Sequence, residues 1–298
     1  MTGWDVLAQQ LAGAAQLGVI YALIAVGFTL YFGVLNVIQF SHGDIVTVGA
    51  FAALTVAAAT GFVPLVVVAA MALTGLVGVV FERAAVRPTR ASPPLITLLA
   101  TLAAGMAIRE AIRLFYPLGS QVHRFPALFP PTPIHLGGVL LRASGLWIAG
   151  IGLGTIVATA VLVERTSLGR AIRATAQDRE AAQMMGVDLS LVLDATFFIA
   201  SALAAVAGIL YGAYYNTVTF DMGIVAGVIG FSAAVVGGLG NVYGAVVGGF
   251  LFALLETLSA AFLPAGSENA DVFAFVIVIL FLVLRPTGIL GEKATQRV

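Results

Sequence analysis

The chain has 298 residues, of which 60% are hydrophobic and 9% carry a formal charge, and its 14 basic residues balance 14 acidic ones. Because soluble domains carry about 25% charged residues, this composition excludes a water-soluble globular enzyme, a disordered protein and a nucleic-acid-binding protein, which would need a basic excess. Cysteine is absent, so disulfides, thiolate metal sites and cysteine nucleophiles are excluded together. We expect one domain, residues 1–298, whose solvent is lipid.

Long runs without formal charge predict transmembrane helices, because about 20 apolar residues cross a bilayer as a helix and lipid does not tolerate unpaired backbone. In chain order the expected spans are residues 9–33, 45–60, 65–81, 93–115, 146–163, 191–215, 222–262 and 269–284. The stretch 222–262 is too long for one span, and Leu239-Gly240-Asn241-Val242 offers a turn inside it. The expected fold class is an all-α polytopic membrane protein, a bundle of about eight or nine transmembrane segments with a candidate re-entrant glycine-rich segment.

Ten of the 14 basic residues gather in three segments, which the positive-inside rule assigns to the cytoplasm. The segments contain Arg83, Arg87 and Arg90; Arg165, Arg170, Arg173 and Arg179; and Arg285, Lys293 and Arg297. This orientation predicts a cytoplasmic loop at residues 164–194 and an external loop at residues 117–142. Nine spans would place the N-terminus outside, and one re-entrant segment would reverse it.

The cytoplasmic loop reads RTSLGRAIRATAQDREAAQMMGVDLSLVL and predicts a short amphipathic helix. Ser167 is the expected cap at its start. Small alanines after Glu180, at Ala181 and Ala182, let such a helix sit flush in a groove, and Gly186 permits a turn of the chain. Two interpretations stay open: a helix that docks into a partner protein and transmits a push, or a solvated interfacial helix.

Residues 36–44, NVIQFSHGD, concentrate polar groups between two long charge-free runs. Polar groups at membrane depth are costly and usually face a cavity or a partner. We therefore take Asn36, Gln39, Ser41, His42 and Asp44 as candidates for the lining of a translocation path, built on a broken helix. The alternative is an interfacial loop between two helices.

A second candidate for this path is the glycine-rich segment 231–249, where Ser232 and Asn241 are the polar groups. It predicts a re-entrant or hinge element, or simply tight helix packing. The chain has no GxxxxGK[ST] motif, so it binds no nucleotide through a P-loop, and we expect no catalytic or metal site in it. An ion-coupled transporter would need a relay of ionisable groups, for which Glu256 and the pair His42 and Asp44 are the candidates.

At this point the whole chain resembles the LivH-like permease subunits of branched-chain amino acid ABC importers. The resemblance rests on five stretches that occur in the order typical of that family. They are GVIYALIAVGFTLYFGVLNVIQFSHGD (18–44), ERAAVRPTR (82–90), SLGRAIRATAQDREAAQMMGVD (167–188), VVGGLGNVYGAVVGG (235–249) and RPTGILG (285–291).

The resemblance implies a transport subunit of the bacterial inner membrane rather than an enzyme. Glu180, Ala181, Ala182 and Gly186 match the EAA coupling motif, although the downstream Ile-x-Leu-Pro element of the fuller motif is missing. The implied partners are a second homologous permease, in a homodimer or heterodimer, two cytoplasmic ATPase subunits and an external solute-binding protein. The chain itself would bind no cofactor, since ATP and Mg belong to the ATPase subunits.

The function that the resemblance implies is ATP-driven import by alternating access. The expected substrates are branched-chain or other small amino acids delivered by the external binding protein. Two alternatives remain open: a permease for urea or short amides within the same family, and an ion-coupled secondary transporter or channel.

Overall fold

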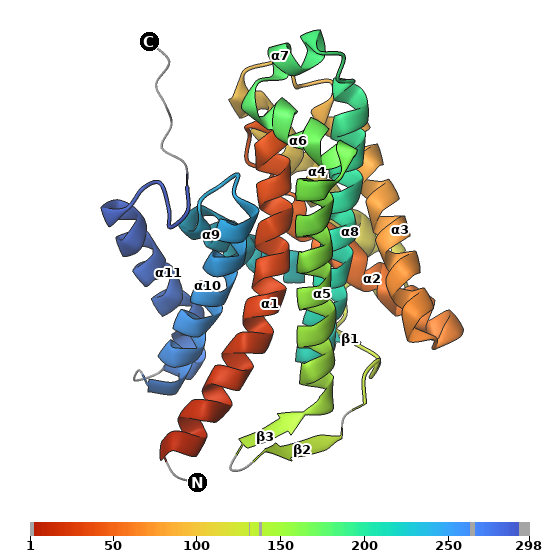
Figure 1. Cartoon of the computed structure of the whole chain (residues 1–298). Coiled ribbons are helices and arrows are strands. Elements are labelled where there is room, and N and C mark those ends of the chain that lie inside the picture. The colour runs from red at the N-terminus through yellow and green to blue at the C-terminus, as the bar shows by residue number, and fades with distance from the viewer. Residues whose placement is uncertain (1–2, 131, 137–138, 263–265, 292–298) are drawn as a thin grey trace.

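The computed structural model describes residues 3–130, 132–136, 139–262 and 266–291 (Figure 1). In this part of the chain most residues are helical, and short strands lie in the connections. The helices are α1 (Gly3–Leu35), α2 (His42–Thr60), α3 (Val63–Phe81), the π-helical turn η1 (Glu82–Val86), α4 (Pro94–Phe115), α5 (Ala143–Arg165), α6 (Ser167–Gln177), α7 (Arg179–Met184), α8 (Leu189–Tyr215), α9 (Met222–Gly237), α10 (Val242–Phe262) and α11 (Gly266–Leu284). The strands are β1 (His123–Arg124), β2 (Pro133–Leu136), β3 (Val139–Arg142) and β4 (Thr217–Val218).

Among the described residues, seven helices are long and apolar enough to cross a membrane, which confirms an all-α polytopic membrane protein. They are α1, α2, α3 with η1, α4, α5, α8 and α10. Two shorter apolar helices, Met222–Gly237 and Asn269–Leu284, add to these. A span count of eight or nine depends on these two and stays a prediction. The turn expected inside 222–262 is present, because α9 ends at Gly237 and α10 begins at Val242.

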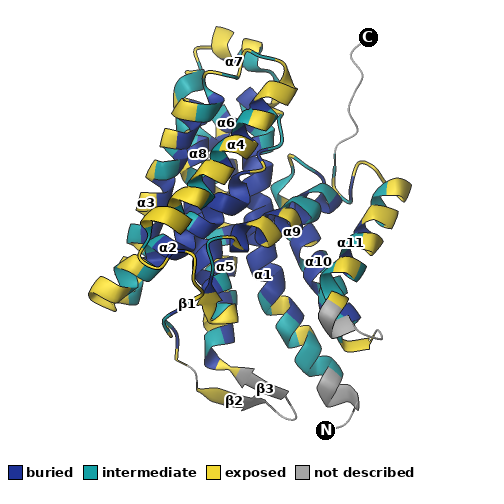
Figure 2. Cartoon of the chain, turned by 180° about the vertical axis from the view of Figure 1, so that it is seen from behind, coloured by how far each residue is buried: buried dark blue, intermediate teal, exposed yellow. Residues whose placement is uncertain are grey.

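The core lies around α1 and α8, which are the most deeply buried of the long helices. α1 packs against α8, α9 and α10, and α8 packs against α2 and α3. Figure 2 shows the buried middle of α1 inside the bundle and the exposed surfaces of α3 and α4 outside. Exposed Leu, Val and Ile side chains on these outer helices suit a lipid environment, which is as apolar as they are.

Two connections in the bundle share one geometry. α1 and α8 both end before an asparagine in the left-handed conformation, Asn36 (φ 53°) and Asn216 (φ 58°), and α2 and α9 begin six residues later. Each position in the second connection lies 180 residues after its counterpart in the first. The next helices meet at Gly43 and Gly223, where a Cβ on either glycine would collide with the other's carbonyl oxygen. The starts of α2 and α9 therefore cross in backbone contact.

The two ends of the bundle differ in structure (Figure 1). α6 and α7 cap the end where α1 finishes, while the β2–β3 hairpin lies at the end where α1 starts. β1 pairs antiparallel with β4, with His123 opposite Val218, so the connection after α4 is fixed to the connection after α8. The predicted cytoplasmic loop and external loop thus lie at opposite ends; Lys293 and Arg297 lie outside the described residues.

Candidate translocation and coupling site

The 36–44 segment turns back into the bundle after α1 ends. Gln39, Ser41, His42 and Asp44 are all buried. The His42 ring packs against Phe28 and Tyr31 of α1, with ring centroids 4.8 and 5.3 Å apart. A Cβ at Gly27 would collide with this ring, so the start of α2 lies beside Gly27 of α1. Gly27 precedes Leu35, the last residue of α1, by about 12 Å along the helix axis, at 1.5 Å per residue. The geometry is that of a broken helix that starts inside the bundle.

The polar side chains of this segment are only partly satisfied. Gln39 donates from Nε2 to Ser41 Oγ over 3.2 Å, while its Oε1 has no hydrogen-bond partner. The ring nitrogens of His42 also lack a hydrogen bond of normal geometry, although the Ile24 carbonyl lies close enough to interact with the ring. Unsatisfied polar atoms are rare in protein interiors and often mark sites that bind a ligand or change conformation.

Asp44 pairs with a residue that the sequence analysis missed. Arg109 of α4 donates from Nε to Asp44 Oδ1 over 2.9 Å and from Nη2 to Oδ2 over 3.3 Å. The available signal was a charge inside the predicted span 93–115. Its partner could not be read from the sequence, because the two residues are 65 positions apart.

The other two candidate path residues lie on or after α9. Ser232 follows Phe231, whose ring packs 5.6 Å from that of Phe40, so α9 runs beside the 36–44 segment. Asn241 instead caps α10: its Oδ1 accepts from the Gly244 N–H over 3.0 Å, and its Nδ2 donates to the Leu290 carbonyl over 3.1 Å. The structure thus places α9, which carries Ser232, beside the segment and gives Asn241 a capping role.

The coupling segment consists of two helices rather than one. Thr166, not the predicted Ser167, caps α6, because its Oγ1 accepts from the Gly169 N–H over 3.0 Å. Asp178 caps α7 by accepting from the Ala181 N–H over 3.0 Å. The chain leaves α7 through Gly186, whose φ of 86° favours glycine.

Helix α7 carries the EAA residues and presents an apolar tip. Glu180 is exposed, Ala181 is half-buried and Ala182 is buried against the bundle. Beyond them Met184 and Met185 are 81% and 85% exposed. Flexible methionine side chains suit protein-binding surfaces, so this tip has the character of such a surface.

Arg179 connects α7 to the membrane part of the chain. Its guanidinium donates to the Val34 carbonyl at the end of α1, one of the carbonyls that a helix end leaves without an intrahelical partner. Burial lowers the pKa of Arg179, and the nearby Arg90 lowers it further. The contact places the coupling helix directly against the residues that precede the 36–44 segment.

A cavity of about 550 Å³ lies between the coupling helices, the end of α1 and the start of α4. Its volume falls in the range of small-molecule sites. Its polar wall consists of Asn36, Arg90, Ser92, Thr97, Thr175, Gln177, Asp178, Arg179 and Glu180. The cavity thus joins Glu180 of the predicted coupling motif to Asn36, the first residue of the predicted path.

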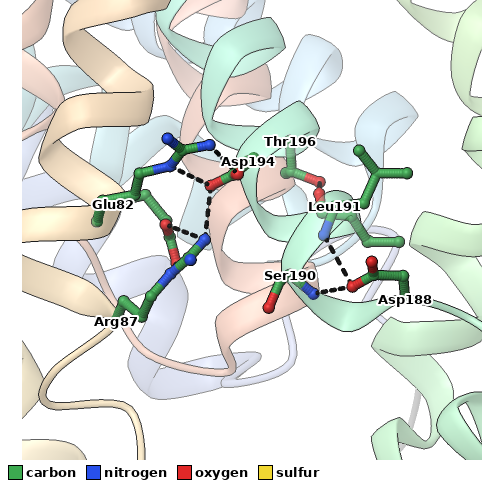
Figure 3. A network of polar contacts seen from close by, with 9 residues as sticks. Glu82, Arg87, Asp188, Ser190, Leu191, Asp194 and Thr196 are labelled. Atoms are coloured by element: carbon green, nitrogen blue, oxygen red, sulfur yellow. Dashed lines mark hydrogen bonds and ion pairs between the residues drawn. The ribbon is translucent and has the colours of Figure 1, made fainter.

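A charge network ties the start of α8 to the end of α3 (Figure 3). Asp194 pairs with Arg83 over 2.7 Å and with Arg87 over 2.9 Å, and Arg87 also pairs with the buried Glu82 over 3.1 Å. The π-helical turn η1 carries Glu82 and Arg83, and such turns are frequent at functional sites. The network thus ties the first turns of α8, the helix that follows α7 in the chain, to the end of α3.

Comparisons with known proteins agree on one family. A family model described as "Branched-chain amino acid transport system / permease component" matches residues 10–282. The chain is 34% identical to the high-affinity branched-chain amino acid transport system permease protein BraD of Pseudomonas aeruginosa, over 97% of each chain. It is 32% identical to LivH of Escherichia coli, again over 97% of each chain. A probable LivH of Methanocaldococcus jannaschii is 27% identical over 94% of this chain and 91% of that one.

The fold is also found among solved structures. PsaBC from Streptococcus pneumoniae in complex with Fab aligns with a TM-score of 0.51, covering 96% of this chain and 94% of that chain. The sequence identity is 11%, so the likeness concerns the arrangement of helices alone.

Proposed function

The chain belongs to the family of permease components of branched-chain amino acid transport systems, and from this membership we propose that it is the membrane subunit of an ATP-driven importer. Its substrates are branched-chain or other small amino acids, delivered by an external binding protein. It is a transport subunit and not an enzyme. The bacterial inner membrane is its proposed location, and the EAA end faces the cytoplasm.

The observation that carries this proposal is the position of α7. The helix projects from one end of the bundle with an apolar tip, Met184 and Met185, and Arg179 joins its base to α1. A subunit without a P-loop needs a partner that hydrolyses ATP, and α7 offers the surface that such a partner would hold. Two ATPase subunits and a second, homologous permease complete the proposed assembly.

The mechanism we propose is alternating access. A movement of the ATPase subunits displaces α7, and Arg179 passes this displacement to the end of α1 and the 36–44 segment. Because α2 and α9 cross in backbone contact at Gly43 and Gly223, a shift of one must move the other. Transport in one direction requires the ATPase to favour one state by several kcal/mol for a near-complete switch.

The test is uptake by the reconstituted complex with its ATPases and binding protein. Loading the binding protein with leucine should stimulate ATP hydrolysis and uptake, whereas loading it with urea should not. Met184→Glu combined with Met185→Glu should reduce leucine uptake by about tenfold or more, since exposed apolar anchors of an interface cost about 2 kcal/mol when lost. Glu180→Arg should also reduce leucine uptake.

The matched control is Met184→Leu combined with Met185→Leu, which keeps the exposed tip of the segment apolar and adds no charge. This variant should transport leucine at the wild-type rate. Uptake that persists without ATP, or that is unaffected by the changes in α7, would contradict coupling to an ATPase and favour a secondary transporter. If only the urea-loaded binding protein stimulated ATP hydrolysis, the chain would instead be a permease for urea or short amides.

A further inference from the structure

Asp44 and Arg109 form an ion pair between two membrane helices, α2 and α4. Their side chains are 5% and 21% exposed, and the guanidinium contacts both carboxylate oxygens. An uncompensated charge within a membrane helix is costly, so intramembrane charges are rare and usually paired. Replacing a buried pair by apolar residues is often neutral or stabilising, so helix packing alone does not explain these two charges.

The ion pair is the end of a polar line along α4. Thr97, Thr101, Gly105 and Arg109 are spaced by four residues, so they share the face of α4 that covers the 36–44 segment. Gly105 is in close contact with that segment, since a Cβ there would lie 2.5 Å from Asp44 Oδ2 and 2.8 Å from Ser41 Cβ. Thr97, at the other end of the line, is part of the cavity wall beneath the coupling helices.

α4 has few contacts with the rest of the bundle. It is the least buried of the candidate spans, with 17% of its apolar window buried, and its main partners are α2 and η1. Thr97 and Thr101 direct their hydroxyls to backbone carbonyls of α4 itself or of the preceding turn. Among the described residues, the bidentate pair is the ionic link between α4 and α2.

A neutral ligand that separated this pair would leave two uncompensated charges, and an ion of one sign would leave one. A zwitterion compensates both, because its carboxylate can bind Arg109 and its ammonium can bind Asp44. The unpartnered Gln39 Oε1 of the same segment, on a side chain that is nearly fully buried, is a further acceptor for an ammonium group.

We propose that Asp44 and Arg109 are the substrate-recognition pair of this permease, which bind the ammonium and carboxylate groups of a zwitterionic α-amino acid during its passage. The inference rests on the proposed function and deepens it, since it names the two residues that bind the charged groups of the amino acid. In the substrate-free chain the two residues neutralise each other and close the path along α4.

The first test measures binding to the wild-type complex without the binding protein. Radiolabelled leucine is competed with isocaproate, which lacks the ammonium, and with isoamylamine, which lacks the carboxylate. We expect both analogues to bind about tenfold or more weaker than leucine, the factor that corresponds to about one lost charged contact. Equal competition by either analogue would overturn the inference, and this result does not depend on any variant folding.

The second test uses variants in the reconstituted importer. Asp44→Leu with Arg109→Met removes both charges and keeps apolar bulk, and we expect it to assemble with the ATPases and to lose leucine uptake by about tenfold or more. Glu110→Gln with Arg113→Gln is the matched control, because it removes an exposed pair of 2.6 Å on the same helix. This control should transport leucine at the wild-type rate.

The outcomes separate the inference from the proposed function. Wild-type uptake by the double variant would show that the pair only ties α2 to α4, and it would overturn the inference while the importer assignment stands. A wild-type complex that transports urea, or that transports leucine without ATP, would overturn the proposed function itself.

Discussion

At the scale of single residues, Arg179 joins the proposed coupling helix α7 to the end of α1. Its guanidinium reaches the Val34 carbonyl, the last part of α1 before the chain turns back toward His42. A charged donor to an orphan helix carbonyl is a favourable contact, because the carbonyl end of a helix carries partial negative charge. Arg179 directly precedes Glu180, Ala181 and Ala182, so we take it as the positioning residue of the proposed motif.

Replacing Arg179 by Ala should therefore reduce coupling more than assembly. We expect leucine uptake per ATP hydrolysed to fall about tenfold, because a hydrogen bond to a charged group contributes about 1.5–3 kcal/mol. The measurement is uptake and ATP hydrolysis on the same proteoliposomes. Arg170→Ala, on the exposed face of α6, is the control and should leave the ratio unchanged. If the Arg179 variant kept the wild-type ratio of leucine uptake to ATP hydrolysis, Arg179 would have no role in coupling.

At the scale of elements, the crossing of α2 and α9 limits how the bundle can move. Both helices start inside the bundle after an asparagine in the left-handed conformation. α9 has 16 residues, about 24 Å at 1.5 Å per residue, and is shorter than a hydrocarbon core of about 30 Å. Short paired helices that meet near the middle of the bundle are the arrangement around which transporters build their moving sites.

Gly43→Ala tests this crossing. The new methyl group would collide with the Gly223 carbonyl oxygen, so α2 and α9 must move apart. Overpacking of this kind costs about 1–3 kcal/mol, and we expect a lower thermal midpoint of the purified complex together with reduced uptake. Gly154→Ala is the control, since nothing lies within 4 Å of a Cβ there. Equal midpoints for the two variants would mean that the crossing can relax freely.

At the scale of the whole molecule, the distribution of basic residues predicts the orientation of the chain in the membrane, and the two ends are proposed to bind different partners. Arg90 and Arg179, from two of the basic segments, line one cavity at the α6–α7 end. The opposite end carries the β2–β3 hairpin and the β1–β4 pairing. With basic residues kept inside, ATPases would dock at the first end and a binding protein at the second.

Single-cysteine labelling checks this orientation, because the natural chain has no cysteine to interfere. Ser120→Cys and Gln183→Cys place one thiol at exposed positions near opposite ends of the bundle. In intact cells a membrane-impermeant maleimide should label the cysteine at 120 and not the one at 183, which should react only after permeabilisation. The unmodified chain gives the background, and the reverse pattern would invert the proposed topology.

The sequence by itself determined the helical membrane fold, most of the span positions, the family and the candidate coupling motif. Each of these depends on local properties: the length of apolar runs, the position of basic residues and a contiguous motif around Glu180. The candidate residues of the 36–44 segment were also visible, because polar groups interrupt an apolar run.

Only the tertiary structure decided which distant residues meet. Arg109 with Asp44, Arg179 with the end of α1, and Gly43 with Gly223 join elements separated by 65 to 180 residues, and one sequence carries no signal for such pairings. It also corrected the α6 cap to Thr166 and gave Asn241 a capping role. The physical reason is that hydrophobicity specifies which helices are buried in lipid, whereas side-chain packing and charge pairing specify how they are arranged.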